Sequence, residues 1–570
     1  MSESPYTRLT RELLAESEVG KTHITRSVSV FFVVAFLFTI TSVPLVQQVL
    51  EVRSGYAERG RWVWPRAYDV LDPLRPAWLA LMNPGGDGPV SRFWNANGIL
   101  MRGFRDYEKA LEEDSFIARA ALPPTQALAA EYLGLGNEQV YLGRQGFLFY
   151  QPDVVYLTGP GFLDPAVLRK RARNGDSGVS KAIQPNPVKA ITQFGEQLKA
   201  MGIHLIVMPL PVKPMIEPGF LSPSYRFPSN PLQNPSYAAF LQAIQKAGID
   251  LLDVSQSLAD DKRATGQSQF LRTDTHWTPQ AMERAAGVLA AKIRALGFAE
   301  SVESVEMIRS TQVIQGEGDI ATMLKLPKPS HLFPKETVTI RPVRYVDGKP
   351  WSADARAAIL VLGDSFLNVF SLAGMGWGAS AGFVEQLSHA LRQPIDTILR
   401  NDAGASATRE ILGQELARGR DRLRGKQVVV WEFAMRELAS GTWDFVSLET
   451  RARNETRFLV LRPGEHLAVK ATIESIGTLP RPGFTPYKDF LTAIHLAKVS
   501  DDPAKEAVVY LQTMKDHELT PVARLKPGDR ISILLTSWTD AERNYGGINR
   551  GELDDENLLL EEPNFAELMP

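Results

Sequence analysis

Apolar strands alternate with amphipathic helices through the middle of the chain, and this alternation constrains the fold more than any other feature. Strand patterns are found at 204–212, 250–254, 357–366 and 427–433, and helix patterns at 187–201, 237–248 and 279–297. The last helix has Thr278 as its N-cap, Pro279 at its first position and Gly297 at its end. Strands that alternate with helices predict an α/β fold around a mostly parallel sheet.

The helical patterns disappear after about Arg451. The segments RFLVLRPGEHLAVKATI, EAVVYLQTM and DRISILLTSW are typical of strands separated by turns. Residues 450–570 are therefore expected to form a separate β-rich, β-sandwich-like module. The aromatic side chains in or just before it are Trp443, Tyr487, Trp538 and Tyr545. For most of them the pattern favours an aromatic core.

One apolar segment near the N-terminus bears on location. Residues 27–50 contain no charged side chain, and this length suits a helix that crosses a bilayer. The apolar stretch is longer than that of a secretory signal and lacks an Ala-x-Ala exit, which favours an uncleaved anchor over a signal or a buried core helix. Basic residues flank it on both sides, so charge leaves the orientation open. Because only a short polar tail precedes the segment, residues 1–26 are expected to be cytoplasmic. Residues 51–135 are expected to form a stalk or packing arm.

Composition excludes several kinds of chemistry. The formal net charge is −2 and no long basic run is present, so nucleic acid is not favoured as a partner. The chain has no cysteine. Disulfides, thiolate zinc sites, iron–sulfur clusters and cysteine nucleophiles are therefore excluded.

Ser365 follows a strand pattern in LVLGDSFLNVF, at the expected turn from strand to helix. Parallel α/β sheets place their sites at the carboxyl ends of strands. A serine hydroxyl becomes a nucleophile only beside a base, usually a histidine that a carboxylate orients. A Gly-Asp-Ser tripeptide taken alone is more typical of a turn or a helix cap.

Asp274 and His276, in LRTDTHWTPQAM, could supply that base and that carboxylate. By itself this segment leaves a capped helix and a functional site equally open. No second histidine lies at ligand spacing, so no metal site is expected. Together with Ser365, the pair meets the requirements of a triad, whose order along the chain is free. Gly404, in RNDAGASATRE, is either a backbone donor of an oxyanion hole or an ordinary turn glycine.

These segments resemble a known family. Gly-Asp-Ser-Phe and Asn-Asp-Ala-Gly-Ala-Ser are similar to the first two blocks of SGNH hydrolases. Asp-Thr-His-Trp, placed before the serine, resembles the alginate O-acetyltransferase family of the AlgJ and AlgX type. Three further segments are also similar to that family: GRQGFLFYQPDVVYLTGPGF, PLPVKPMIEPGFL and VVVWEFAMREL. The resemblance covers about Gly136 to Ala439 and implies an SGNH-hydrolase-like domain over 136–445.

The resemblance also implies roles for residues. Ser365 would be the nucleophile, His276 the base and Asp274 the residue that orients it, with the backbone N–H groups of Ser365 and Gly404 as the oxyanion hole. Candidates for substrate contact or for support of the site are Trp277, Asp364, Lys213, Asn401, Glu432 and Arg436. The Asp-His pair precedes the serine, and the usual oxyanion asparagine block is missing, which leaves a third donor unassigned. Glu432 and Arg436 are expected to form a structural ion pair.

The implied function is a single-pass inner-membrane O-acetyltransferase with its catalytic domain in the periplasm. It would acetylate an exopolysaccharide through an acetyl-serine, without a cofactor. The acetyl group would come from a membrane-bound O-acyltransferase or another donor. The β-rich module could bind glycan, with Trp443, Tyr487, Trp538 and Tyr545 as candidates for sugar stacking. Two alternatives stay open: a polysaccharide deacetylase or esterase with the same triad, and a non-catalytic glycan-binding scaffold. An intact triad argues against the scaffold.

Overall fold

The computed structural model describes residues 25–59, 64–82, 88–174, 183–225, 230–298, 304–401, 404–450, 457–480, 487–553, 555 and 558–569. The expected cytoplasmic tail, 1–26, lies almost entirely outside them. The chain forms two compact units, one that ends at Pro123 and one that begins at Pro124.

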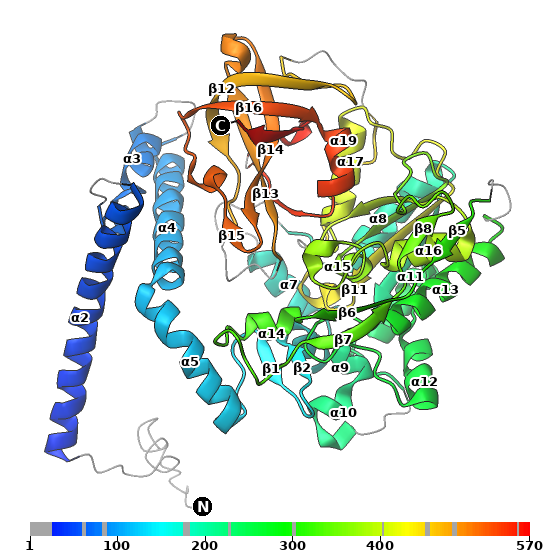
Figure 1. Cartoon of the computed structure of the whole chain (residues 1–570), viewed down its shortest axis with the longest axis horizontal. Helices are drawn as coiled ribbons and strands as arrows, with labels where there is room; N and C mark the ends of the chain where they lie inside the picture. Colours follow the sequence, from blue (N-terminus) through cyan, green and yellow to red (C-terminus); the bar gives the residue numbers. More distant parts are fainter. Residues whose placement is uncertain are drawn as a thin grey trace, which may run out of the picture. The chain divides into compact units, whose positions relative to one another are not determined.

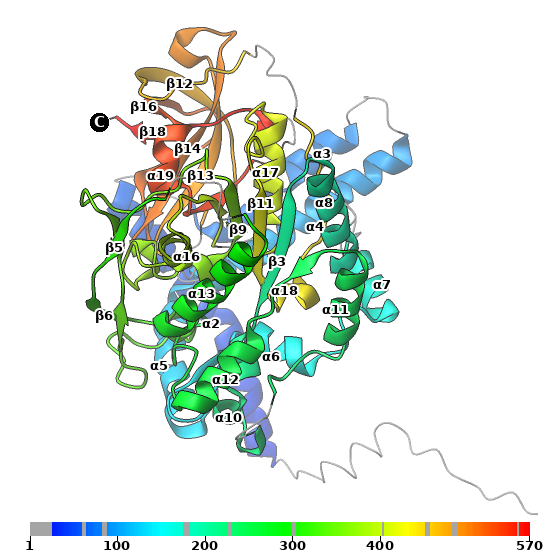
Figure 2. The ribbon, with the colours of Figure 1, turned by 90° about the vertical axis from the view of Figure 1, so that its right-hand side faces the viewer.

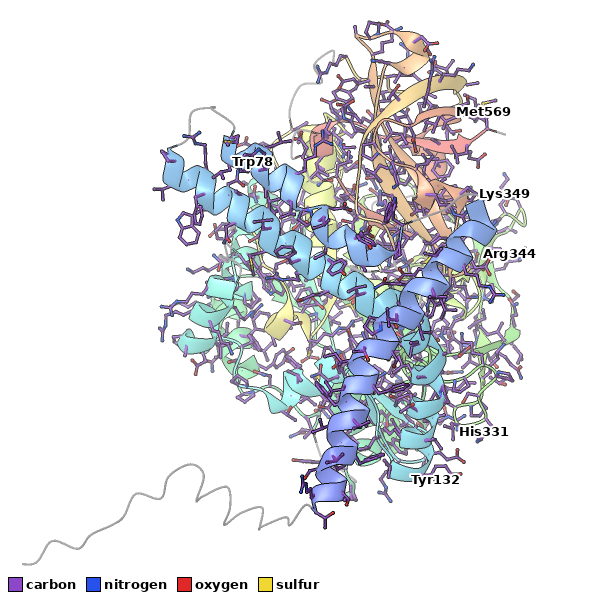
Figure 3. All side chains as sticks on the ribbon, turned by 90° about the vertical axis from the view of Figure 1, so that its left-hand side faces the viewer. Trp78, Tyr132, His331, Arg344, Lys349 and Met569 are labelled. Atoms are coloured by element: carbon purple, nitrogen blue, oxygen red, sulfur yellow. The ribbon has the colours of Figure 1, made fainter. Side chains whose placement is uncertain are left out.

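The first unit is helical. Its helices are α2 (Arg26–Arg59), η1 (Arg66–Leu71), α3 (Leu74–Met82) and α4 (Pro89–Asp114), and α5 (Phe116–Leu133) crosses into the second unit. In α2 the stretch Arg26–Arg53 is long and apolar enough to cross a membrane, and a signal sequence can have the same length and composition. The helices α3 and α4 pack on each other, and Trp78 projects from α3 (Figure 3).

The second unit is organised around a five-stranded sheet of order β10-β9-β11-β3-β4, in which every pairing is parallel. Its strands are β3 (His204–Leu210), β4 (Asp250–Leu251), β9 (Ile359–Gly363), β10 (Asp396–Leu399) and β11 (Val428–Ala434). All residues of β9 and β11 are buried, which explains why these strands appear in the sequence as continuous apolar runs. The four expected strands are present, though β4 is shorter than its pattern.

Helices cover both faces of this sheet (Figures 1 and 2). On one face lie α8 (Pro187–Ala200) and α11 (Tyr237–Lys246), and on the other α13 (Pro279–Ala295) and α16 (Phe383–Leu391). Right-handed crossovers require this arrangement. The connection β3–α11–β4 leads toward one edge of the sheet and β9–α16–β10 toward the other edge, so their helices lie on opposite faces. The hydroxyl of Thr278 accepts a hydrogen bond from Ala281 N at the start of α13, as expected of its N-cap.

Short elements surround the carboxyl edge of the sheet. Before and between the first strands lie β1 (Val140–Leu142), β2 (Leu148–Tyr150), α6 (Gln151–Thr158), α7 (Pro165–Asn174), α9 (Lys213–Ile216), α10 (Pro218–Leu221), η2 (Pro223–Tyr225) and α12 (Ser255–Thr265). An insertion between α13 and β9 contains β5 (Met307–Arg309), β6 (Gln312–Gly316), α14 (Asp319–Met323), β7 (Glu336–Ile340) and β8 (Val343–Tyr345). After β9 follow α15 (Ser365–Asn368), η3 (Ala373–Met375), α17 (Ala407–Ala417) and α18 (Glu437–Ser440).

The β-rich module is a barrel, and the expected β-sandwich-like arrangement is wrong. Its elements are β12 (His466–Ile476), β13 (Phe490–Ala497), η4 (Val499–Asp501), β14 (Glu506–Lys515), β15 (Glu518–Leu519), η5 (Pro521–Arg524), β16 (Arg530–Ser537), α19 (Trp538–Tyr545), β17 (Asn549–Gly551), η6 (Leu558–Leu560) and β18 (Asn564–Leu568). The pairings β14–β18–β16–β12–β13 return from β13 to β14 and close a ring. A closed ring pairs the edges that a sandwich leaves free.

The aromatic candidates for sugar stacking are largely interior. Trp443 has no exposed surface and packs against Trp431 and Phe433 in the core of the α/β sheet, outside the barrel. Trp538 is buried against Tyr510 in the apolar cluster between the outer face of the barrel and α19. These two residues therefore serve as core, as the pattern favoured.

Replacing Trp443 by alanine tests this assignment. Loss of a fully buried tryptophan leaves a cavity, so Trp443→Ala is expected to lower the free energy of unfolding by about 3–5 kcal/mol. Chemical denaturation of the full chain measures it. The control is Phe445→Ala, because that ring lies two residues away and is 55% exposed; its effect should stay within about 0.5 kcal/mol. Equal effects of the two variants would contradict the assignment.

Candidate active site

Ser365 lies where the sheet delivers it, at the first position of α15, directly after β9. Asp364 caps this short helix: its Oδ1 accepts from Phe366 N at 2.9 Å. The preceding glycine has no room for a side chain. A Cβ at Gly363 would lie 2.3 Å from Leu367 Cδ1 and 2.6 Å from Glu432 Oε2. The Gly-Asp-Ser turn is thus fixed by packing and by its own cap.

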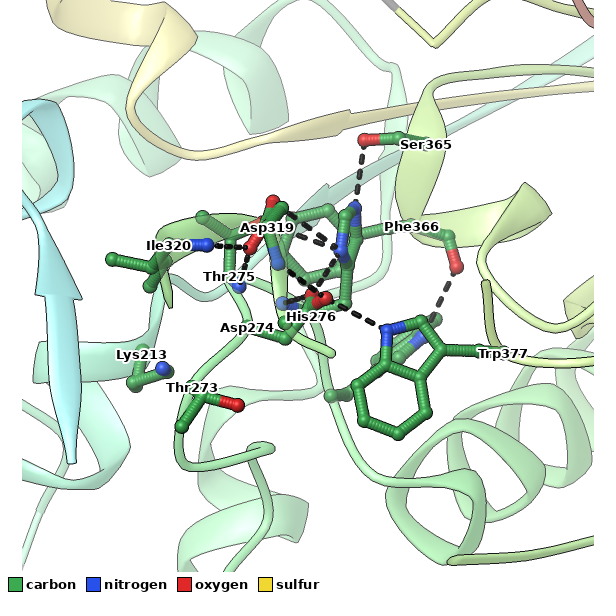
Figure 4. A network of polar contacts seen from close by, with 12 residues as sticks. Lys213, Thr273, Asp274, Thr275, His276, Asp319, Ile320, Ser365, Phe366 and Trp377 are labelled. Atoms are coloured by element: carbon green, nitrogen blue, oxygen red, sulfur yellow. Dashed lines mark hydrogen bonds and ion pairs between the residues drawn. The ribbon is translucent and has the colours of Figure 1, made fainter. Parts of the chain in front are cut away.

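The three residues expected to form a triad lie in one hydrogen-bonded row (Figure 4). His276 Nε2 is 2.8 Å from Ser365 Oγ, and His276 Nδ1 is 2.6 Å from Asp274 Oδ1. The backbone N–H of His276 also donates to Asp274 Oδ1, at 3.0 Å. The exposed fractions of Asp274, His276 and Ser365 are 2%, 1% and 3%. The row is therefore almost completely shielded from solvent.

Burial and charge act in opposite directions on this pair. Burial would raise the pKa of Asp274, but the charge of His276 and the hydrogen bonds to the carboxylate hold that pKa at about 2. Burial would lower the pKa of His276, but the charge and hydrogen bond of Asp274 outweigh it and keep the pKa above its ordinary 6.5. The geometry thus gives His276 a permanent anionic partner on Nδ1 and leaves Nε2 directed at the serine.

Two residues that the sequence did not indicate complete the environment of Asp274. Its Oδ2 accepts from the indole N–H of Trp377 at 2.8 Å and from Asp319 N at 3.1 Å. Trp377 lies in the loop after α15, and Asp319 begins α14 of the insertion. Burial, and then the negative charge of Asp274, raise the pKa of Asp319 to about 6.

Weak signals for both residues exist in the sequence. Trp377 stands between two glycines, and Asp319 follows Gly318 at a helix start. A Cβ at Gly318 would lie 2.1 Å from Thr273 O, so the glycine permits this turn to approach the loop of Asp274. Neither signal says which distant residue is contacted, because the partners are 45 and 103 positions apart in the chain.

Lys213 stabilises the loop that contains Asp274. Its buried ammonium donates to Leu148 O at 2.7 Å and to Arg272 O at 3.2 Å. Burial lowers the pKa of Lys213 to about 8, although the charges of Asp274 and Asp319 act in the opposite direction. On the other side of the same loop, the carboxylate of Glu336 accepts from the N–H groups of Arg272 and Thr273, at 3.0 and 2.8 Å.

Asp364 and Glu432 form a second buried acidic group, beneath the serine turn. Glu432 Oε2 accepts from Asp364 N at 2.9 Å, and Asp364 Oδ2 accepts from Ala434 N at 3.2 Å. Burial, and then the charge of Asp364, raise the pKa of Glu432 well above its ordinary value. Through its hydrogen bond with Asp364 N, Glu432 joins β11 to the turn.

The expected ion pair between Glu432 and Arg436 is wrong. Arg436 instead pairs with the buried Asp153, Nη1 to Oδ1 at 3.1 Å, and approaches Glu437 at 3.7 Å. Its guanidinium lies over the rings of Tyr150 and Phe366. Glu432 Oε2 instead accepts from Asp364 N, at the serine turn.

The remaining candidates are structural or lie at the rim of the turn. Trp277 is fully buried, stacks on Phe383 and donates to Phe366 O at 3.0 Å, so it holds α15. Asn401 follows β10 and accepts from Asn368 Nδ2 of α15 at 2.9 Å. Gly404 has φ +65°, a conformation that favours glycine, and it lies against the carboxylate of Glu437.

Asp274, His276 and Asp319 also bring together three groups that could ligate a metal ion, with ligand atoms within 4.8 Å of one another. These atoms are already engaged in hydrogen bonds. Asp319 Oδ1 accepts from Thr275 N and Oδ2 from the Thr275 hydroxyl, while both oxygens of Asp274 accept N–H groups. The donor set matches a charge relay better than a metal site.

The role of Asp274 in setting the pKa of His276 can be measured directly. In Asp274→Asn the ring stays buried but loses its anionic partner, so the pKa of His276 is expected to fall. Titration of the histidine ring signals by NMR checks this.

Asp347→Asn is the matched control, since Asp347 is a surface carboxylate paired with Lys349. It should leave the titration of His276 unchanged. An unchanged pKa of His276 in Asp274→Asn would contradict the electrostatic assignment.

Comparison with known proteins places this geometry in context. Residues 169–435 match the family model of the SGNH hydrolase-like domain, acetyltransferase AlgX. A probable alginate O-acetylase AlgJ of Pseudomonas aeruginosa is 28% identical over 246 residues, which cover 42% of this chain and 61% of that protein. Its counterpart in Pseudomonas syringae pv. tomato is 31% identical over 250 residues, 43% of this chain and 60% of that protein.

The chain thus spans about three fifths of the length of these curated relatives. Among solved structures, the O-acetyltransferase domain of Pseudomonas putida AlgJ aligns with a TM-score of 0.39 and 22% identity, and covers 53% of this chain and 93% of that one. From the family model and the AlgJ relatives, residues 169–435 belong to the AlgJ/AlgX-like family of SGNH hydrolase-like domains.

Proposed function

We propose that this protein is an O-acetyltransferase that places acetyl groups on hydroxyls of a polysaccharide through an acetyl-Ser365 intermediate. The observation that carries the proposal is the row Asp274–His276–Ser365, with spacings of 2.6 and 2.8 Å. It lies inside the segment that matches the acetyltransferase family model. The relatives named alginate O-acetylase support a polysaccharide acceptor.

The first half-reaction loads the serine. His276 Nε2 takes the hydroxyl proton while Ser365 Oγ attacks the acetyl carbonyl of the donor ester. The bond from the carbonyl carbon to the donor oxygen breaks, and the departing oxygen takes the proton from His276. We assign the backbone N–H groups of Ser365 and Gly404 to the oxyanion that forms between these events.

The second half-reaction reverses the first with another alcohol. A sugar hydroxyl gives its proton to His276 Nε2 and attacks the acetyl carbon. The ester bond to Ser365 breaks, and Oγ recovers the proton from His276. Acetyl is transferred without a change of oxidation state, so the scheme needs no cofactor, only a donor protein or a small acetyl ester.

The match to the acetyltransferase family model favours transfer over hydrolysis. A deacetylase or esterase must admit water to the acyl-enzyme, whereas a transferase keeps water away until the sugar arrives. The apolar stretch Arg26–Arg53 supports a single-pass anchor. We propose that the catalytic unit lies on the periplasmic side. A membrane-bound O-acyltransferase is the partner that we propose as the acetyl supplier.

The role of Ser365 is tested with p-nitrophenyl acetate as donor and a panel of oligosaccharides as acceptors. Ser365→Ala should lower acetyl transfer at least about 10³-fold, because the nucleophile of a triad cannot be replaced by its neighbours. Mass spectrometry of the protein and of the sugars checks both half-reactions.

The matched control is Ser352→Ala, since the carbonyl of Ser352 accepts from Tyr345 and its hydroxyl is remote from the row. It should transfer acetyl like the wild type. Free acetate without acetylated sugar would replace the transferase by an esterase. Equal activity in Ser365→Ala would remove the triad.

The pH dependence follows from the state of His276. The ring must be neutral to accept the serine proton, and its pKa is raised above 6.5 because Asp274 outweighs the effect of burial. The rate of Ser365 acetylation should therefore fall as the pH drops, and the midpoint of this fall should lie above pH 6.5. Asp274→Asn should shift this acid limb to lower pH. A limb centred below 6.5 in the wild type would contradict the assignment.

A further inference from the structure

The loop after β10 lies between the serine turn and the barrel. β10 pairs with β9, so the loop begins beside the end of the strand that carries Ser365. Arg400 N donates to Gly363 O at 3.0 Å, two residues before the serine. Asn401 accepts from Asn368 Nδ2 at the end of α15. One side of this loop is therefore fixed to the serine turn.

The other side of the loop is fixed to the barrel. Asn401 Nδ2 donates to Gly547 O at 2.8 Å, and Asn401 O accepts from the hydroxyl of Tyr487 at 2.6 Å. Both partners belong to the barrel module, one before β17 and one before β13. The side chain and the carbonyl of Asn401 thus connect α15 with two barrel segments.

Arg400 strengthens the same connection. Its buried guanidinium donates to Arg550 O at 3.2 Å and lies 3.6 Å from the carboxylate of Glu552. Glu552 in turn accepts from the hydroxyl of Tyr510, on the outer face of β14. The barrel also approaches α15 directly, because a Cβ at Gly547 would lie 3.2 Å from Asn368 Nδ2.

These contacts bear on the proposed reaction because Gly404 follows Asn401 by three residues. Its N–H can serve an oxyanion only if the loop keeps one position relative to Ser365. Moving a catalytic group by about 1 Å lowers the rate on the order of 10²-fold. The hydrogen-bond partners of Asn401, which come from α15 and from the barrel, prevent such displacement.

We propose that the C-terminal barrel is a positioning element of the acyl-transfer site, and that Tyr487 and Asn401 form the joint through which it acts. The inference rests on the proposed function and extends it. The barrel holds Asn401 against α15, the helix that begins with Ser365, so Ser365 becomes acylated at full rate only with this joint intact. Tyr487 and Asn401 are positioning residues and do not touch the acetyl group.

The experiment uses the full chain and p-nitrophenyl acetate, and follows the rate at which Ser365 becomes acetylated. Tyr487→Phe removes one hydrogen bond and should lower this rate about tenfold. Asn401→Ala removes both side-chain contacts and should lower it about 10²-fold. The double variant should be no slower than Asn401→Ala, because the two residues act through one joint. The acid limb of the pH profile should not move, since His276 is untouched.

Tyr345→Phe is the matched control: it also removes a hydrogen bond from a tyrosine hydroxyl to a backbone carbonyl, that of Ser352, but in β8 and not at the joint. It should acylate like the wild type. A wild-type rate in Tyr487→Phe, or independent effects in the double variant, overturns the inference while Ser365 still becomes acetylated. If wild-type Ser365 does not become acetylated at all, the proposed function fails, and the inference fails with it.

Discussion

A buried carboxylate determines how the site is assembled. Asp274 is charged and almost without solvent, so its cost of burial must be met by hydrogen bonds and by an opposite charge. Its donors come from separate parts of the chain: the loop of His276, the start of α14 and the loop of Trp377. Each of these segments is held in place by the carboxylate that it stabilises. The orientation of the His276 imidazole follows from these contacts of Asp274.

The acids around the serine turn occupy two opposite states for physical reasons. Asp274 has a cation and several N–H donors, and remains ionised. Glu432 lies next to another carboxyl group and has one oxygen without a hydrogen-bond partner in the described part of the chain, so protonation is the cheaper state. The first acid tunes a base, whereas the second joins a strand to a turn.

Much of this arrangement could be predicted from the sequence, where the signal is local. The apolar runs of β9 and β11 and the cap of α13 are determined by residues close to one another, and each lies where it was expected. The contacts of Trp377 and Asp319 with Asp274 are not local, and nothing in their own neighbourhoods specifies a partner. The ion pair expected for Arg436 failed for the same reason, since Asp153 lies 283 positions away.

The barrel shows another limit of local patterns. Alternating strands indicate a β-rich module, but a sandwich and a barrel use the same alternation. Closure depends on the pairing of β13 with β14 as well as with β12, which is a property of strand order and not of any one strand.

The separation of His276 from Ser365 by 89 positions has a consequence for the folding chain. Neither segment is reactive until His276 and Ser365 come together, because a serine without its base is hardly nucleophilic. Long-range contacts of this kind form late, after the entropy of closing the intervening loop has been overcome. A partly folded molecule therefore carries an inert hydroxyl, and reactivity arises together with the completed sheet.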